Sequence, residues 1–183
     1  MSRFGTIANM DKGTEFWEER RFNKKRDSMT RTILIKRITK ENWEEAFKIS
    51  VHEYQSTFVP TVAESLAFAY LKPWDEALDP YALYHNDVII GAFYLSYTPG
   101  SEHNYWIGGF QIDKKYQGKG YGQETLRKIV DFIKMTHPAC KSISLTVEKE
   151  NTQAIYLYEK VGFTSQKKAN MYGEVVFKLD VPD

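Results

Sequence analysis

The part of the sequence whose residue types and spacing best fit a chemical task is a glycine-rich turn, Gln117-Gly118-Lys119-Gly120-Tyr121-Gly122. Glycine lets a backbone approach a ligand closely, because it carries no side chain. The apolar residues after the turn recur at helical spacing, so the turn opens onto the first amides of a helix, which lack intrahelical partners. Such amides and the helix dipole favour negative charge. The turn is therefore predicted to bind an anion.

The order of the glycines narrows the class of anion. A P-loop has Ser or Thr directly after its lysine, whereas Gly120 follows Lys119 here. The dinucleotide fingerprint has its third glycine one position later, where Gln123 stands. The pattern Gln-Gly-x-Gly-x-Gly instead resembles the acetyl-CoA pyrophosphate loop of the GNAT superfamily of N-acetyltransferases. A glycine-rich connection without any ligand is the alternative interpretation.

A second block of sequence resembles the same superfamily. Residues 142–147 alternate polar and apolar types, as a half-buried strand does. Asn151 and Thr152 can cap a following helix, and Gly162 is placed to end it. The run that resembles the second signature block is Asn151-x-x-Ala154-x-x-Leu157-Tyr158-x-x-x-Gly162-Phe163.

The resemblance covers residues 105–163 well and residues 32–98 in general layout. It implies an N-acetyltransferase in which an amine attacks the thioester of acetyl-CoA, the co-substrate. The positions that match cofactor-binding residues of the family are Phe110, Gln111, Ile112, Gln117, Gly118, Lys119, Gly120, Tyr121, Gly122, Gln123 and Asn151. Tyr158 matches the position whose phenol often protonates the departing thiolate. Ordinary pKa values of about 10 for a phenol and about 8.5 for a thiol make that transfer nearly balanced. A core tyrosine on the buried face of its helix is the alternative for Tyr158.

The elements that would hold these two blocks predict an α/β (α+β) fold. A strand is predicted at residues 32–38, followed by a helix capped by Thr39 that carries Trp43, Ala46, Phe47 and Ile49. Residues 61–64 have the form of a capping box, and the helix they begin should end before Pro73. A hairpin is predicted over residues 81–96. The resulting order, β-α-α-β-β-β-α-β-α-β-β, indicates a mixed, mostly antiparallel sheet flanked by helices on both faces, the layout of GNAT folds.

Length and composition limit the organisation of the chain. A length of 183 residues predicts a single N-acetyltransferase domain, at residues 32–183. Residues 1–31 contain mixed charge runs and are predicted to be a charged N-terminal extension. A disordered, solvated segment, a translated leader ahead of Met29 and a basic arm for an anionic partner remain open for it. Whether residues 1–31 belong to the functional protein is likewise left open.

Several classes of function are disfavoured by composition. The net charge of +1 gives no general attraction to nucleic acid. The sequence has neither an apolar stretch of about 18 residues nor a signal peptide, so no membrane partner is expected. The single cysteine, Cys140, predicts a buried structural thiol and a reducing, cytoplasmic location. No histidine has metal-ligand spacing, so no metal is predicted.

The acceptor is predicted to be a small primary amine, with a polyamine such as spermidine or spermine as the best candidate. Residues 54–64 and 72–74 resemble small bacterial spermine/spermidine acetyltransferases. Carboxylates interleaved with aromatic rings also suit a flexible polycation. The residues of this kind are Glu53, Tyr54, Phe58, Glu64, Phe68, Tyr70, Trp74, Asp75, Glu76, Asp79 and Tyr81. Packed aromatics and solvated acids are the alternative interpretation.

Other functions stay open from sequence alone. They are acetylation of a protein N-terminus or of an aminoglycoside, and acyl-CoA binding without catalysis. Candidates for the general base are Glu53, Glu102 and His103, each of which also fits an ordinary surface position. A homodimer is common among relatives, but the sequence does not indicate the oligomeric state.

Overall fold

The computed structural model describes residues 32–74 and 76–182, so the predictions for residues 1–31 and Asp75 lie outside the described residues. The strands are β1 (Ile33–Arg37), β2 (Ala77–His85), β3 (Val88–Tyr97), β4 (Tyr105–Ile112), β5 (Ser142–Val147), β6 (Thr164–Ala169) and β7 (Val175–Asp180). The helices are α2 (Trp43–Ala46), α3 (Val62–Leu71), α4 (Tyr121–Thr136) and α5 (Thr152–Val161), with a short 3-10 helix η1 (Glu53–Gln55). None of the helices in the described ranges is long and apolar enough to cross a membrane.

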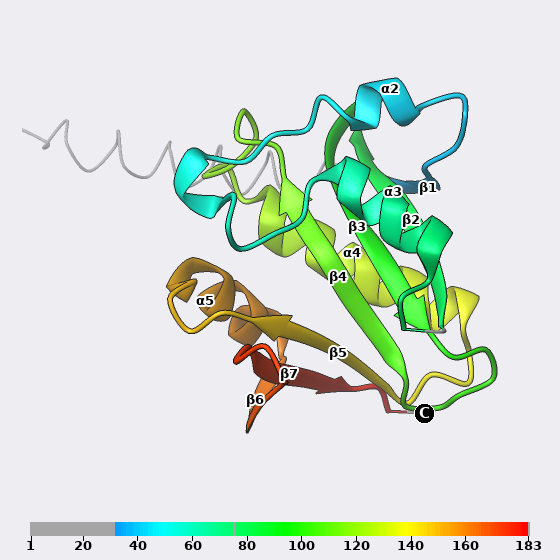
Figure 1. Cartoon of the computed structure of the whole chain (residues 1–183), viewed down its shortest axis with the longest axis vertical. Helices are drawn as coiled ribbons and strands as arrows, with labels where there is room; N and C mark the ends of the chain where they lie inside the picture. Colours follow the sequence, from blue (N-terminus) through cyan, green and yellow to red (C-terminus); the bar gives the residue numbers. More distant parts are fainter. Residues whose placement is uncertain (1–31, 75, 183) are drawn as a thin grey trace, which may run out of the picture. The chain divides into compact units, whose positions relative to one another are not determined.

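The strands form one seven-stranded sheet in the order β1-β2-β3-β4-β5-β7-β6 (Figure 1). Neighbouring strands are antiparallel except for β4 and β5, which are parallel and are in register at Trp106 and Ser144. The predicted order of strands and helices is therefore confirmed, as is the mixed, mostly antiparallel sheet.

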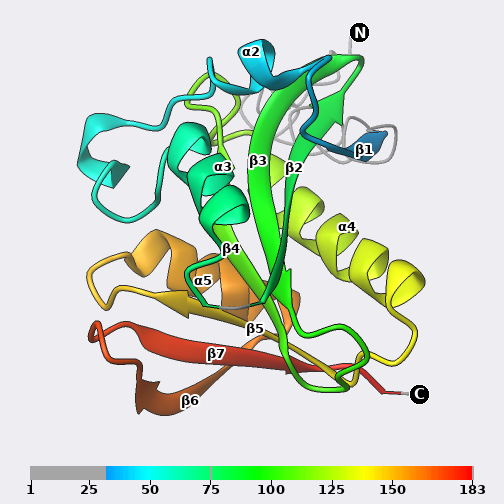
Figure 2. The ribbon, with the colours of Figure 1, turned by 45° about the vertical axis from the view of Figure 1, so that its right-hand side comes forward.

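The residues of β2 show why helices cover both faces of the sheet. Tyr81 and Leu83 belong to a core cluster that includes residues of α4, whereas Ala82 and Tyr84 belong to a second cluster that includes Val62 of α3. Successive side chains of a strand point to opposite faces, so each cluster lies on its own side of the sheet. Figure 2 shows α3 and α4 on opposite sides of the strands. The predicted two-sided helical cover is confirmed.

The two helices predicted before the hairpin differ in outcome. Thr61 begins α3 with a capping box, in which Thr61 Oγ1 accepts from the Glu64 amide at 3.2 Å and Glu64 Oε2 accepts from the Thr61 amide at 2.7 Å. The prediction of a helix capped by Thr39 is wrong, because α2 has four residues and its N-cap is Asn42. Ala46 is the only buried residue of α2, so little tertiary packing is available to extend the helix.

An irregularity in β4 bends the strand where the site will form. The pairing of β3 with β4 shifts between Ala92 and Tyr94, so that one residue of β3 faces two residues of β4. Gly109, in this part of β4, has a φ of +58°, a conformation that favours glycine. Bulges of this kind bend and twist a strand. Beyond their shared pair, β4 and β5 diverge (Figure 1).

Cys140 is buried, as the sequence predicted. Its side chain is 3% exposed, and its Sγ donates to the Ser142 carbonyl oxygen at 3.4 Å. Burial raises the pKa of the Cys140 thiol. A thiol with a raised pKa carries little thiolate at neutral pH, so Cys140 is a structural residue and a poor nucleophile.

Candidate active site

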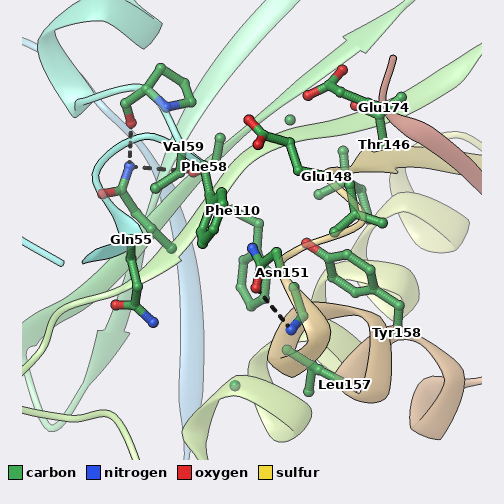
Figure 3. A pocket seen from close by; sticks show the side chains of 18 of the residues that line it. Gln55, Phe58, Val59, Phe110, Thr146, Glu148, Asn151, Leu157, Tyr158 and Glu174 are labelled. Atoms are coloured by element: carbon green, nitrogen blue, oxygen red, sulfur yellow. Dashed lines mark hydrogen bonds between the residues drawn. The ribbon is translucent and has the colours of Figure 1, made fainter. Parts of the chain in front are cut away.

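The diverging strands β4 and β5 border a cavity of about 970 Å³. The glycine turn and α5 also line it, so the two sequence blocks, which are distant in the chain, meet in one place. Figure 3 shows the cavity from close by. The predicted site residues that line it are Phe110, Gln111, Ile112, Gln117, Gly118, Gly120, Gly122, Gln123, Asn151 and Tyr158.

The glycine turn brings backbone amides to the cavity at the beginning of α4. Gly118 has a φ of +71° and Gly120 a φ of +86°, and Gly120 is the N-cap of α4 without a side-chain cap. No acceptor among the described residues is paired with the amides of Gly118, Gly122 or Gln123. The dipole of the 16-residue helix adds positive potential at the same place. This combination can hold a diphosphate.

Two residues of the turn lie with their side chains away from the cavity. Lys119 Nζ donates to the Lys115 carbonyl oxygen at 2.8 Å. Tyr121 is 9% exposed, and its ring centroid lies 5.2 Å from that of His85 and 5.8 Å from that of Tyr116. Neither Lys119 nor Tyr121 is among the residues that line the cavity. Their side chains therefore take no part in lining the cavity.

Gln111 and Gln117 use their side-chain amides inside the protein. Gln117 Nε2 donates to the Ile112 carbonyl oxygen at 2.8 Å and to Gln55 Oε1 at 2.9 Å. Gln111 Nε2 donates to the Pro60 carbonyl oxygen at 2.9 Å. Both side chains therefore hold β4 and the glycine turn against the segment around residues 55–60, and they act as positioning residues.

We expect Gln117→Leu to lower the free energy of unfolding by about 1–3 kcal/mol, because it removes two hydrogen bonds and leaves the Ile112 carbonyl without its side-chain donor. Urea unfolding followed by fluorescence measures this loss. Gln166→Leu is the matched control, because the Gln166 amide is exposed and bonds only to Thr164, two residues away. Equal unfolding midpoints for the two variants would contradict the positioning role.

Asn151 is the N-cap of α5. Its Oδ1 accepts a hydrogen bond from the Ala154 amide at 3.2 Å, and Figure 3 shows its side chain at the cavity. Because the cap uses the side-chain oxygen, the side-chain NH2 group is the part of Asn151 that can donate to a ligand.

Tyr158 packs in the core and also faces the cavity. Its ring packs in the core, with centroids 6.3 Å from those of Phe163 and Phe177. Its side chain points into the cavity (Figure 3), although the residue is only 8% exposed. Burial, and then the negative charge of Glu174, raise the pKa of Tyr158 to about 12. The phenol is therefore neutral at physiological pH and can donate a hydrogen bond.

The acidic and aromatic residues predicted for the acceptor separate into two groups. Those that line the cavity are Phe58, Phe68, Trp74 and Glu76. Glu64 serves the capping box of α3, Asp79 pairs with Arg37, and Tyr81 lies in the core. Those that also lie outside the cavity lining are Glu53, Tyr54 and Tyr70. Of the candidates for the general base, Glu53, Glu102 and His103, none lines the described cavity.

Sequence reasoning missed cavity residues on β3 and β4 and in the segments that follow β5 and precede β7. The main ones are Tyr94, Trp106, Glu148, Tyr172 and Glu174. The alternation along β5 could have indicated Glu148, because it shares a face with Thr146, two residues earlier. No local pattern around residue 174 indicates the cavity, because the pairing of β7 with β5 brings that residue there.

Comparison with curated proteins finds acetyltransferases of several kinds, among them the following two. The chain is 29% identical over 154 residues to the spermine/spermidine N(1)-acetyltransferase of Bacillus subtilis (strain 168). This alignment covers 79% of this chain and 96% of that protein. It is 33% identical over 81 residues to N-alpha-acetyltransferase 30 of Saccharomyces cerevisiae. This second alignment covers 42% of this chain and 44% of that protein.

Solved structures show the same fold. An aminoglycoside acetyltransferase in complex with coenzyme A matches with a TM-score of 0.63 and 20% identity, covering 81% of this chain and 95% of that one. A spermidine N-acetyltransferase from Vibrio cholerae, in complex with CoA and spermine, matches with a TM-score of 0.61 and 16% identity, covering 80% and 92% of the two chains. At these identities the likeness concerns the fold.

A family model, that of the acetyltransferase (GNAT) family, matches residues 40–163, which is more than half of the chain. The matched range includes the glycine turn, both strands that border the cavity and Tyr158. The chain therefore belongs to the acetyltransferase (GNAT) family, and it is an N-acetyltransferase with acetyl-CoA as its co-substrate.

Proposed function

We propose that this enzyme acetylates a primary amine of a polyamine such as spermidine or spermine. The observation that carries the proposal is the charge of the cavity lining, which includes the carboxylates Glu76, Glu148 and Glu174 and a single described cationic side chain, Lys160. Aromatic rings lie among these carboxylates and offer cation–π contacts. An acceptor with several positive charges suits this lining.

The similarity to curated proteins supports the same class of acceptor. The relative from Bacillus subtilis, which aligns over most of both chains, is named for spermine and spermidine. The similarity to N-alpha-acetyltransferase 30 covers less than half of this chain, so it supports a protein N-terminus less well. An aminoglycoside is also a polycation and remains a competing acceptor.

The proposed roles of the site residues follow the geometry of the cavity. The amides of the glycine turn hold the pyrophosphate of acetyl-CoA, because they lie at the beginning of α4. Backbone groups of residues 110–112, on the edge of β4 that faces the divergence, contact the pantetheine and acetyl region. Asn151 contributes its side-chain NH2 group. These contacts fix the thioester beside Tyr158, which lowers the entropic part of the barrier.

Tyr158 is proposed to stabilise the departing sulfur. A phenol with a pKa of about 12 is a weaker acid than a thiol, whose ordinary pKa is about 8.5, so complete proton transfer costs several kcal/mol in this environment. A hydrogen bond from the neutral phenol to the sulfur does not carry that cost and still stabilises the developing negative charge. Tyr158 therefore acts first as a hydrogen-bond donor in the transition state.

A panel of amines tests the proposed acceptor. Release of the CoA thiol should be measured with spermidine, n-butylamine, kanamycin and a peptide with a free N-terminus. We expect kcat/KM to be highest for spermidine, by about tenfold or more, because two or more ammonium groups can meet the carboxylates of the cavity. Preferred turnover of the peptide or of kanamycin would contradict the proposal.

We also propose a cytoplasmic location, in keeping with the single cysteine.

A further inference from the structure

Two carboxylates lie at the adjoining ends of β5 and β7, where both strands reach the cavity. The last antiparallel pair of these strands joins Val147 to Val175. Glu148 directly follows β5 and Glu174 directly precedes β7, so the two residues come next after this pair on the two strands. Both residues line the cavity, and Figure 3 shows their side chains near each other above the hydroxyl of Tyr158.

This pair has no cationic partner among the described residues. Like charges directly opposite each other destabilise a sheet, so a neighbouring cation would be expected if the pair were structural. None of the ion pairs within the described ranges involves Glu148 or Glu174. Lys160, which also lines the cavity, lies with its Nζ 5.2 Å from the centroid of the Tyr156 ring. Glu174 accepts a side-chain hydrogen bond from the neutral amide of Asn170, at 2.5 Å.

The hydroxyl of Tyr158 points to a bound ligand at this part of the cavity, which in the proposed reaction is the thioester beside which the acceptor must lie. Tyr158 is more than nine-tenths buried, and no described residue forms a hydrogen bond with its hydroxyl group. Figure 3 shows that hydroxyl pointing into the cavity below Glu148. Among the described residues, the one fully buried side-chain nitrogen or oxygen without a hydrogen-bond partner is His85 Nδ1, so the Tyr158 hydroxyl is open to the cavity, where a ligand can bond to it.

We propose that Glu148 and Glu174 form an ammonium-binding subsite for a second, non-reacting nitrogen of the acceptor. This proposal rests on the proposed polyamine acetylation and adds how the acceptor is selected. A pair of carboxylates stabilises the charged form of an amine, whereas the attacking nitrogen must be neutral. The nitrogen held by the pair is therefore not the nucleophile. The subsite therefore favours acceptor molecules that carry a second amine over monoamines.

The subsite is tested by removing its charge without changing its shape. The variants are Glu148→Gln, Glu174→Gln and the double variant, assayed with spermidine and with n-butylamine. We expect kcat/KM for spermidine to fall about 10- to 50-fold in each single variant, mainly through KM, because one charged contact is lost. For n-butylamine kcat/KM should change less than about twofold. Glu150→Gln is the matched control, because Glu150 is exposed and does not line the cavity.

A stability measurement separates lost binding from a damaged fold. Because the two carboxylates repel each other in the free enzyme, Glu148→Gln should unfold at the same or a higher urea concentration than the wild type. A lower midpoint together with equal losses for both amines would overturn the proposal. A fall in kcat for both amines with a shifted pH profile would also overturn it, because the pair would then act as the general base.

The two proposals fail in different ways. If the wild type turns over n-butylamine or a peptide but not spermidine, the polyamine function is wrong, and the subsite falls with it. If the wild type prefers spermidine and the Gln variants keep that preference, the subsite is wrong and the polyamine function stands.

Discussion

Tyr158→Phe is expected to lower kcat by about 100-fold or more, while the affinity for acetyl-CoA changes less than about twofold. The substitution removes only the hydroxyl, so the ring keeps its packing against Phe163 and Phe177. The hydroxyl has no hydrogen-bond partner among the described residues, so its loss should not weaken the fold. The hydrogen bond to the departing sulfur exists only in the transition state, which is why the loss appears in kcat.

The measurement is steady-state thiol release at saturating spermidine, combined with calorimetric titration of coenzyme A. Tyr70→Phe is the matched control, because Tyr70 is 87% exposed on α3 and does not line the cavity. An unchanged kcat for Tyr158→Phe would show that the sulfur leaves without help from this residue. A loss confined to coenzyme A affinity would assign Tyr158 to binding.

The raised pKa of Tyr158 also sets the sign of its pH dependence. Because burial holds the phenol protonated up to about pH 12, kcat should show no fall due to Tyr158 between about pH 8 and pH 10. The folded-state pKa lies above the unfolded value of about 10. Its contribution to stability is therefore complete below about pH 10 and is lost as the pH rises towards 12.

Gly120→Val is expected to weaken binding of coenzyme A by about 100-fold or more. Gly120 has a φ of +86°, where a β-branched side chain is strained. Relaxing that strain moves the backbone of the turn, and the new side chain occupies the approach that a diphosphate needs. Both effects act on the amides at the beginning of α4. Isothermal titration calorimetry with coenzyme A measures the loss.

Gly100→Val separates strain from ligand binding. Gly100 has a φ of +78°, and nothing lies within 4 Å of a Cβ added there, but it belongs to the turn between β3 and β4 outside the cavity lining. The two variants should lose similar stability, about 1–2 kcal/mol, because both place a side chain at positive φ. Only Gly120→Val should lose affinity. Equal affinity in both would refute the pyrophosphate role of the turn.

The sequence predicted those parts of the fold that depend on local pattern. The capping box at Thr61 and the alternation of β5 both depend on neighbours in the chain, and both were found. The prediction of a helix capped by Thr39 was wrong. Its apolar residues could be read from the sequence, but whether other elements pack against them could not. Burial of Ala46 alone did not sustain more than α2.

The site divides in the same way. The glycine turn and Tyr158 belong to patterns that can be read along the chain. The carboxylates Glu148 and Glu174 do not belong to such a pattern, because they become neighbours only through the pairing of β5 with β7. The aromatic side of the cavity was partly found: Phe68 and Trp74 come from the predicted segment, whereas Tyr94 comes from β3.

The single register pair between β4 and β5 has a mechanical consequence. Four strands lie on one side of this junction and three on the other, and residues of both edges line the cavity where the strands diverge. Acetyl-CoA bound along the free edges of β4 and β5 would bridge the two parts of the sheet where these strands diverge. Binding of acetyl-CoA would thereby stiffen the sheet, and release of coenzyme A would loosen it. The rigidity of the sheet would therefore change once in each catalytic cycle.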